Sequence, residues 1–417
     1  MNKLKNLILI SVLFLTACAE NPYETRSEED STVSDTINES GYVQIPSNTN
    51  EKIGNITFAC EPDPINAEDF YVMRSPRYYL DSEIRPELPK KDYAGDIEKL
   101  KASVHELFGF DIPDDRILVH GLRGTGSPVK IRNDAIIEFT GYTDQEYYSE
   151  NMILAQLYDK NNSFDFYDFR NVTGEWPNRY LERKVYYPDN IPDTEYEMVD
   201  GSKMNISESI NRADEIIKKV YELKLLDEEI ALKLNKIGVH TTDIGKTVIN
   251  LRYRQIIEGL PVNDDGTNLF NDIGDSMTKF TYFDISFSGN EYPMFIRNVM
   301  STSIESKEKL NTVMNYQEAQ EKLAKGLAPN LEFTVTEAGL RYCCIYDNVS
   351  EYDELRPMWV FVLEDPTFDD EKLTMDDMEN IDKANPFQYY PRTVGYVDAV
   401  NGDIYYLNCE NKVFSQG

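Results

Sequence analysis

Two capped helices, each followed by a hairpin signal, most limit how this chain can fold. Residues 205–208 (NISE) and 315–318 (NYQE) each place a helix-capping Asn three residues before a Glu, so both side chains satisfy free backbone N–H groups. An amphipathic stripe follows each cap: Ile210, Ala213, Ile216, Ile217 and Val220 after the first, and Ala319, Leu323 and Leu327 after the second. The caps lie 110 residues apart, which indicates an internal repeat.

A second pair of matching segments supports the repeat. YFDISFSGNEY (282–292) and YVDAVNGDIYY (396–406) each have Tyr, Asp two residues later, a Gly-containing turn and a closing aromatic residue. Asn401-Gly402 between β-rich flanks predicts a type I′ hairpin, which needs positive φ at both positions. Chance similarity between two α+β stretches is the alternative, because such turn signals are common.

The sequence predicts an α+β protein of antiparallel sheets, each covered by a helix. Runs such as FDFYDF and GDIYYL, bounded by Asn, Asp, Gly and Pro, are typical of strands. We expect two copies of a helix–strands–hairpin unit, at 203–304 and 305–417. Residues 53–202 should form an N-terminal α+β unit that contains a third, divergent copy built on a helix over 94–108. In the last copy, a helix over 315–326 should cross four strands, RYCCIYD, MWVFVLE, VGYVDAV and DIYYLNC. This copy should fold alone, because its core is local and needs nothing from residues 19–200.

The chain begins like a secreted protein. Lys3 and Lys5 precede an apolar run over 7–15 that is too short to span a bilayer. Leu15-Thr16-Ala17-Cys18 resembles the bacterial lipobox, which implies cleavage before Cys18 and diacylation of its thiol; an ordinary secretory peptide that contains a cysteine is the alternative. We therefore expect a lipoprotein signal peptide at 1–17 and a palmitate-type lipid anchor on Cys18, at the extracytoplasmic face of the cell membrane.

Composition limits the partners of the mature chain. Residues 18–52 should comprise the lipidated Cys18 and a tether. The tether is too polar to bury enough surface to offset its ordering entropy, which predicts a flexible, disordered segment. The chain has 42 basic and 74 acidic residues, a net charge of −32 that repels nucleic acid and anionic headgroups. Solubility at a surface explains this acidity, and we prefer that explanation to a specific cationic ligand.

Two segments of the last copy and one of the first carry a family resemblance. After the helix NYQEAQEKLAKGL, residues 356–361 (RPMWVF) and 397–404 (VDAVNGDI) resemble two strand signatures of the PepSY module. Residues 253–266 (YRQIIEGLPVNDDG) look like the related propeptide module of secreted metalloprotease precursors. The layout is also similar to uncharacterised lipoproteins of low-GC Gram-positive bacteria and, distantly, to regulators of the YycH and YycI type. The resemblance implies a non-enzymatic module that inhibits, docks onto or senses another protein.

The candidate catalytic residues do not have the spacing of known catalytic motifs. His105, His120 and His240 are scattered, and His105-Glu106 lacks the second His of a zinc protease helix. Residues 127–130 match Ser-x-x-Lys, but in a Gly-rich loop without the partner motifs of penicillin-recognising enzymes. The Gly-rich residues 121–126 lack the spacing of a phosphate loop. We therefore predict no catalytic residue.

Cation-binding patterns fail as well. Asn263, Asp265 and Gly266 occupy positions typical of a calcium loop, but Pro261 stands at the first ligand position, which favours a simple turn. The acidic stretch 364–382 reads as a solvated insertion between strands. No cofactor and no metal site is predicted.

Four cysteines remain besides Cys18. Cys60, Cys343, Cys344 and Cys409 are an even number, which outside the cytoplasm permits disulfides. Adjacent Cys343 and Cys344 on one strand point to opposite faces, so at most one of them faces the neighbouring strand. A disulfide from Cys409 to Cys343 or Cys344 and a set of free thiols both stay open.

Together these patterns predict a lipid-anchored extracytoplasmic protein, not an enzyme, that binds or regulates an envelope protein or peptide through strand edges and Tyr-rich faces. A solute-binding lipoprotein of a transporter is the alternative, and it would require two lobes of alternating βαβ units with parallel strands. An extracytoplasmic hydrolase comes third, because no triad, metal set or motif supports it.

The anchor can be tested directly. Cys18→Ala should block lipidation, because only the cysteine sulfur can form the thioether to lipid. We expect uncleaved precursor or protein shed into the medium, measured by membrane fractionation and partition into detergent. Unchanged membrane retention of the variant would contradict the lipobox interpretation.

Overall fold

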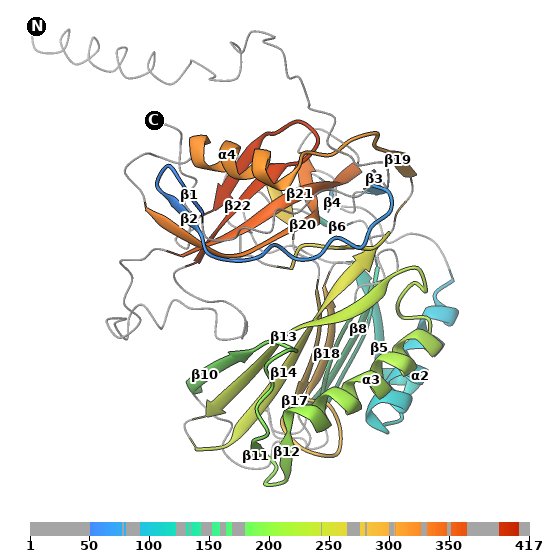
Figure 1. Cartoon of the computed structure of the whole chain (residues 1–417). Coiled ribbons are helices and arrows are strands. Elements are labelled where there is room, and N and C mark those ends of the chain that lie inside the picture. The colour runs from blue at the N-terminus through green and yellow to red at the C-terminus, as the bar shows by residue number, and fades with distance from the viewer. Residues whose placement is uncertain are drawn as a thin grey trace, which may run out of the picture. The chain divides into compact units, whose positions relative to one another are not determined.

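Among the residues that the computed structural model describes, two large sheets and three α-helices dominate (Figure 1). The structure describes residues 51–76, 79–80, 92–121, 131–132, 135–142, 152–158, 164–168, 180–242, 244–264, 276–279, 282–299, 304, 306–326, 332–347, 352–364 and 392–407. All of these belong to one compact unit, residues 36–417. The protein is therefore a mixed α and β structure in which strands predominate.

The larger sheet has ten strands among the described residues. In sequence order they are β5 (Ile117–Gly121), β7 (Ala135–Tyr142), β8 (Met152–Tyr158), β9 (Phe164–Asp168), β10 (Tyr180–Tyr186), β13 (Ala231–Thr242), β14 (Thr247–Ile257), β15 (Leu260–Pro261), β17 (Tyr282–Phe287) and β18 (Phe295–Val299). Their spatial order is β10-β13-β14-β17-β18-β9-β8-β7-β5, with β15 beside β14, and every ladder is antiparallel.

The smaller sheet has nine described strands, drawn from distant parts of the chain. They are β1 (Glu51–Ile53), β2 (Ile56–Phe58), β3 (Tyr71–Pro76), β16 (Ser276–Lys279), β19 (Ser306–Lys309), β20 (Phe333–Asp347), β21 (Tyr352–Glu364), β22 (Arg392–Asp398) and β23 (Ile404–Leu407). Two short ladders join β11 (Glu195–Glu197) to β12 (Lys203–Asn205) and β4 (Tyr79–Leu80) to β6 (Ile131–Arg132).

Three helices cover the sheets, and their sequences explain where they begin. The predicted helix over 94–108 is α2 (Ala94–Phe108), which is followed by the 3-10 turn η1 (Asp114–Arg116). Asn205 caps α3 (Ile206–Glu222) by accepting from the Glu208 N–H, so that predicted cap is confirmed. At α4 (Tyr316–Gly326) the reciprocal capping arrangement is complete, because Asn315 accepts from the Glu318 N–H and Glu318 accepts from the Asn315 N–H.

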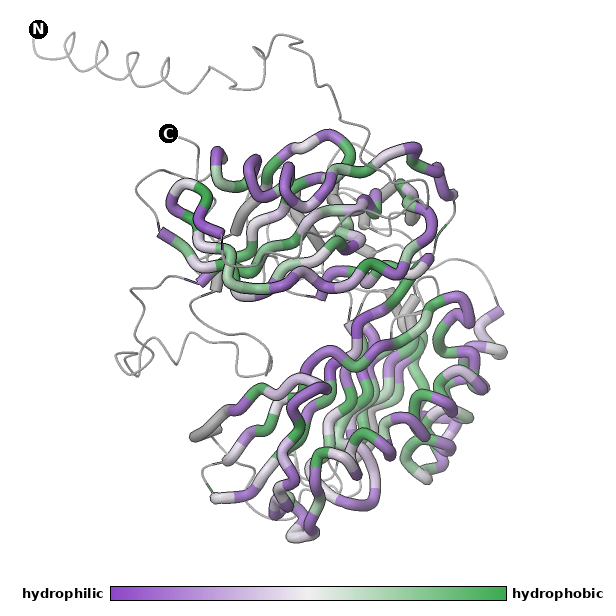
Figure 2. The backbone as a smooth tube through the Cα atoms, viewed as in Figure 1, coloured by the Kyte–Doolittle hydropathy of each residue, from purple (hydrophilic) through white to green (hydrophobic). Residues whose placement is uncertain are grey.

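Each large sheet has an apolar core on its helix-covered face. The core of the larger sheet combines residues of α2 and α3 with alternate residues of seven strands, and Figure 2 shows α3 alternating between hydrophobic and hydrophilic positions. In the smaller sheet, Ala319 and Leu323 of α4 pack with Trp359, Phe361 and Val397. The predicted helix over an antiparallel β20-β21-β22-β23 sheet is therefore confirmed.

The same order of elements occurs three times. Helix α2 is followed by β5-β7-β8-β9, α3 by β13-β14-β17-β18 and α4 by β20-β21-β22-β23, and in each case the four strands pair antiparallel in chain order. The first two units join edge to edge through the β9–β18 ladder, which makes one continuous sheet. Strands β2 and β3 lie in the smaller sheet, whereas β5 and β7–β10 lie in the larger one, so both sheets draw on residues 53–202.

Two finer predictions were wrong. The core around α4 is not local, because Ile56, Phe58, Phe70 and Met73 are part of it, and β2 and β3 pair with β20 and β21. The hairpin is not type I′, because only Gly402 has a positive φ (79°). A longer loop connects Asp398 to Asp403, and the Asp398 carboxylate accepts from the Val400 N–H at 2.8 Å, as is common in turns that begin with Asp.

Several predicted features lie outside the described residues. They are the signal peptide 1–17, Cys18, the tether apart from residues 51 and 52, the Ser127–Lys130 motif, Asp265, Gly266, Leu327, residues 365–382 and Cys409. In the described part of the chain, none of the helices combines the length and apolarity that a bilayer-spanning helix requires.

The shared core of the smaller sheet leads to a prediction about fragments. Residues 305–417 expressed alone should not fold, because strands β2 and β3 and their apolar side chains would be missing. Circular dichroism and amide spectra should show a disordered fragment, whereas residues 51–417 should be folded. A cooperative unfolding transition of the short fragment would contradict this expectation.

Candidate functional site

A row of polar and charged side chains crosses the larger sheet on the face opposite its helices. The row consists of Glu138, Gln156, Asp165, Arg297, Asp284, Arg252 and Lys236, one from each of seven neighbouring strands, and we call it the charged row. Each member is the direct cross-strand partner of the next, from β7 to β13. Leu118 of β5 pairs with Glu138 and extends the row by one strand.

Strand alternation places the charged row on this face. Successive side chains of a strand point to opposite sides, so the residues that flank each row member face the helices. Phe164 and Phe166 flank Asp165, Phe283 and Ile285 flank Asp284, and all four belong to the helix-side core. The apolar core on one side therefore sets the face on which the ionic side chains lie.

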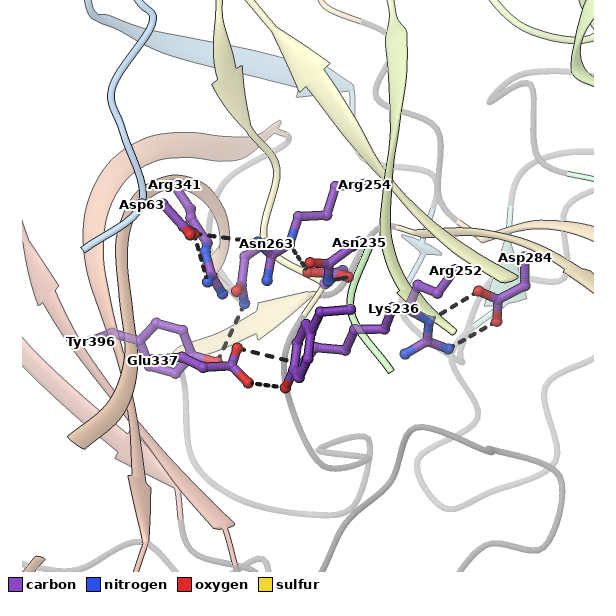
Figure 3. Close-up of polar contacts among 12 residues, drawn as sticks. Asp63, Asn235, Lys236, Arg252, Arg254, Asn263, Asp284, Glu337, Arg341 and Tyr396 are labelled. Carbon is purple, nitrogen blue, oxygen red and sulfur yellow. Dashed lines mark hydrogen bonds and ion pairs between the residues drawn. The ribbon is translucent and has the colours of Figure 1, made fainter. Parts of the chain in front are cut away.

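The Arg252–Asp284 pair is the most buried part of the charged row. The Arg252 Nε and Nη2 atoms each donate to a different Asp284 oxygen at 2.9 Å, and the side chains are only 5% and 4% exposed (Figure 3). The guanidinium also stacks on Tyr282, 3.9 Å from the ring centroid. A bidentate pair with this geometry offsets the cost of removing two charges from water.

Electrostatics keep Arg252 charged. Burial alone would lower the pKa of Arg252, but the charge of Asp284 and the hydrogen bonds to it more than reverse this effect, so the pKa is raised. Burial raises the pKa of the Asp284 carboxyl, and Arg252 opposes that shift. Both carboxylate oxygens accept from the guanidinium and the side chain is almost fully buried, so this carboxylate is not placed to take a proton from a substrate.

The charged row becomes more exposed toward β8. Arg297 donates to Asp165 at 2.9 Å with side chains 35% and 18% exposed, and Gln156 donates to Glu138. Burial, with the charge of Asp165, raises the pKa of the neighbouring Tyr167 to about 12, so its hydroxyl stays protonated at neutral pH. This half of the charged row is within reach of solvent.

At its other end the charged row reaches the smaller sheet. The Lys236 Nζ lies 3.6 Å from the Glu337 carboxylate of β20, and the Tyr187 hydroxyl donates to the same carboxylate at 2.7 Å (Figure 3). A bulge in β20 lies between Val335 and Glu337 and changes the register of that strand against β21. Glu337 therefore connects the two sheets through a basic and a phenolic partner.

A second polar cluster connects the sheets beside this point. The Asp63 carboxylate accepts from Arg254 of β14 at 3.3 Å and from Arg341 of β20 at 3.2 Å (Figure 3). Arg254 also donates to the buried Asp264, which accepts from Asn235 at 2.8 Å. The cluster matches each buried cation with a carboxylate, as buried charges require.

Cys60 is beside these charges and has a free thiol. Burial raises its pKa to about 12, and the negative charges of Glu337 and Asp63 add to that effect. A thiol reacts as its thiolate, so Cys60 is a poor nucleophile at neutral pH. The described charges here are arranged for mutual pairing, and they do not activate a nucleophile.

The structure separates most residues that the sequence singled out. Cys343 and Cys344 are buried on opposite faces of β20, in two different apolar clusters, as alternation predicted. His105 contacts Asp111 at the surface, His120 lies in β5 and His240 is buried in β13, so the three histidines lie on three different elements.

The predicted turn at 261–266 has a structural role at its described end. The Asn263 N–H donates to the Tyr342 carbonyl and its side chain donates to the Tyr396 hydroxyl, which connects the two sheets. Within the described part of the chain, no group of three or more His, Cys, Asp or Glu side chains is placed to hold a metal ion.

Sequence reasoning missed the charged row, although a signal was present. In AIIEFT, FDFY, YFDISF and FIRNV, one charged residue interrupts the apolar pattern of a strand. Alternation puts each of these charges opposite its apolar neighbours. Only the register of six ladders shows that they form one row.

Comparisons with known proteins give two distant structural neighbours. An uncharacterized protein from Eubacterium rectale has a TM-score of 0.46 and 13% identity, covering 84% of this chain and 90% of its own. The YpeB C-terminal domain of Bacillus megaterium has a TM-score of 0.33 and 8% identity, covering 74% of this chain and 96% of its own. No protein-family model and no curated protein matches the sequence. Likeness at this level does not assign a family.

The buried pair of the charged row can be tested by substitution. Arg252→Met should lower the free energy of unfolding by about 3–5 kcal/mol, because Asp284 would stay buried without its partner. The loss should shrink as pH falls, since protonation neutralises Asp284. Urea unfolding followed by tryptophan fluorescence measures both effects.

Two further variants serve as controls. Arg252→Met with Asp284→Leu should restore most of the stability, because an apolar pair of similar size leaves no uncompensated charge. Arg297→Met should cost only about 1 kcal/mol, since its pair is partly solvated. An Arg252→Met variant as stable as the wild type would show that the pair is dispensable.

Proposed function

We propose that this chain is a membrane-anchored, extracytoplasmic lipoprotein that binds and regulates an envelope partner protein without catalysing a reaction. The lipobox residues and Cys18 motivate the anchor, and the apolar run at 7–15 motivates export. The partner is an envelope protein or peptide, because the acidic surface disfavours nucleic acid.

The observation that carries the binding role is the pairing within the charged row. Its buried charges are matched across strands, and Lys236 is matched by Glu337 of the other sheet. Catalytic groups need an accessible acid, base or nucleophile with a suitable pKa, and the Arg252–Asp284 pair offers neither access nor a free proton. A rigid sheet with exposed edges is suited to holding another polypeptide.

We further propose that the three helix-and-four-strand units are PepSY-like modules. Support comes from the recurring element order and from the strand signatures at 356–361 and 397–404, which lie on β21 and across the β22–β23 loop. The antiparallel ladders of the larger sheet do not favour the solute-binding alternative, which requires parallel βαβ lobes.

Photo-crosslinking in native membranes tests the proposal. A benzophenone amino acid placed in turn at the exposed apolar residues Leu118, Tyr187, Ile244 and Val400 should give a discrete adduct with one envelope protein from at least one position. Cys18→Ala should abolish that adduct, because the released chain loses its local concentration at the membrane. Absence of any adduct from all four positions in the anchored protein would contradict the binding role.

A further inference from the structure

The larger sheet has a two-fold symmetric strand order. The ladder β9–β18 is at its centre, and β8, β7 and β5 on one side correspond to β17, β14 and β13 on the other. The row of eight residues follows the same symmetry: Leu118 in β5 corresponds to Lys236 in β13, with Asp165 and Arg297 paired at the centre. Helices α2 and α3 both pack into the core on the same face, as this relation requires.

The two halves differ at their outer edges. On one side, β10 pairs antiparallel with the outer edge of β13. At the equivalent place on the other side, no strand among the described residues pairs with the outer edge of β5. The symmetric order therefore has one strand position filled and the equivalent position without a described strand.

The strands at the two edges also differ in their residues: β10 carries features that protect an edge strand, and β5 does not. Strand β10 (YLERKVY) carries three charged residues and a bulge between Tyr180 and Glu182, which are features that protect edge strands from pairing with other chains. Strand β5 (ILVHG) has no Lys, Arg, Asp, Glu or Pro, and its Leu118 side chain is 60% exposed. Within the described residues, β5 itself carries none of the charged or proline residues that usually protect an edge strand.

Acidic side chains surround the start of β5. Asp111 and Asp114 have side chains 90% and 82% exposed and contact His105 and Lys101, and Asp115 is exposed beside them. On the next strand, Glu138 is the neighbour of Leu118 in the row and has Gln156 as its cross-strand partner on the other side. A basic segment would meet complementary charge along this edge.

We propose that the outer edge of β5 accepts an extended basic segment of the envelope partner as an added antiparallel strand. This inference rests on the proposed binding function and specifies its site. Ile117 and Val119 pack toward the helix-side core, so the added strand would present apolar or aromatic residues on that side, as Tyr186 does in β10. On the other side it would contact Leu118 and place Lys or Arg near the acidic groups.

The probe for this site is a fluorescent peptide with the β10 sequence RYLERKVYY (179–187). It should bind the unlipidated mature chain in fluorescence anisotropy, and a carbonyl-labelled Val in the peptide should acquire the amide I frequency of a strand. Leu118→Lys should weaken binding about tenfold or more, because it removes an apolar contact and adds a like charge. The control is Ile244→Lys, which changes a 43% exposed apolar residue between β13 and β14. It should leave binding unchanged.

Each contrary result overturns the proposal in a defined way. Equal binding of a scrambled peptide would show that net charge alone attracts it. Binding that Leu118→Lys does not weaken would indicate displacement of β10 from β13, and no binding would show that the edge does not accept such a strand. A membrane adduct from Tyr187 or Val400 but not from Leu118 would keep the binding function and reject this site.

Discussion

The Arg252–Asp284 ion pair is the interaction on which the arrangement of the larger sheet depends. Both side chains are almost fully buried, and each would be costly to bury alone. The bidentate geometry requires β14 and β17 to pair in one register, because a slip of either strand by one residue would turn its charge toward the helix-side core and leave the other charge unpaired. The same constraint recurs at Asp165 and Arg297, so neighbouring ladders hold one another in register.

The charged row connects this sheet to the other one. Lys236 contacts Glu337, and the Asp63 carboxylate bridges Arg254 and Arg341, so ionic pairs from both sheets meet at one place. Such partners must be positioned accurately, since a buried cation without a carboxylate would destabilise the protein by several kcal/mol, about 3–5 in known cases. The two sheets are thus coupled by polar contacts, each with its own apolar core on the helix-covered side.

The edge of β5, which has no described strand beside it, follows from the same repeated architecture. Three helix-and-four-strand units each end in two strand edges, and most of these edges are closed by another described strand of the chain, as β13 is by β10. The β5 edge has no such described strand and no charged residue of its own. Because backbone groups at a sheet edge retain their hydrogen-bonding capacity, this edge is the one that we propose accepts another polypeptide.

Local features could be predicted from the sequence because they depend on neighbours in the chain. The Asn205 and Asn315 caps, the helix Ala94–Phe108 and the opposite faces of Cys343 and Cys344 follow from residues a few positions apart. The hairpin at 398–403 shows the limit of such reasoning. Asn401-Gly402 marked the turn, but Asp398 accepts from backbone N–H groups and lengthens the loop.

Contacts between residues far apart in the sequence could not be predicted from it and are seen only in the folded structure. The pairing of β2 with β20 brings residues 56–58 into a core that looked complete within 305–417, because apolar side chains do not encode which distant strand will cover them. Likewise, strand alternation alone places Asp165, Asp284 and Arg252 opposite their apolar neighbours. Strand order and register decided that these charges meet, since Coulomb attraction acts between atoms a few ångströms apart, whatever their separation along the chain.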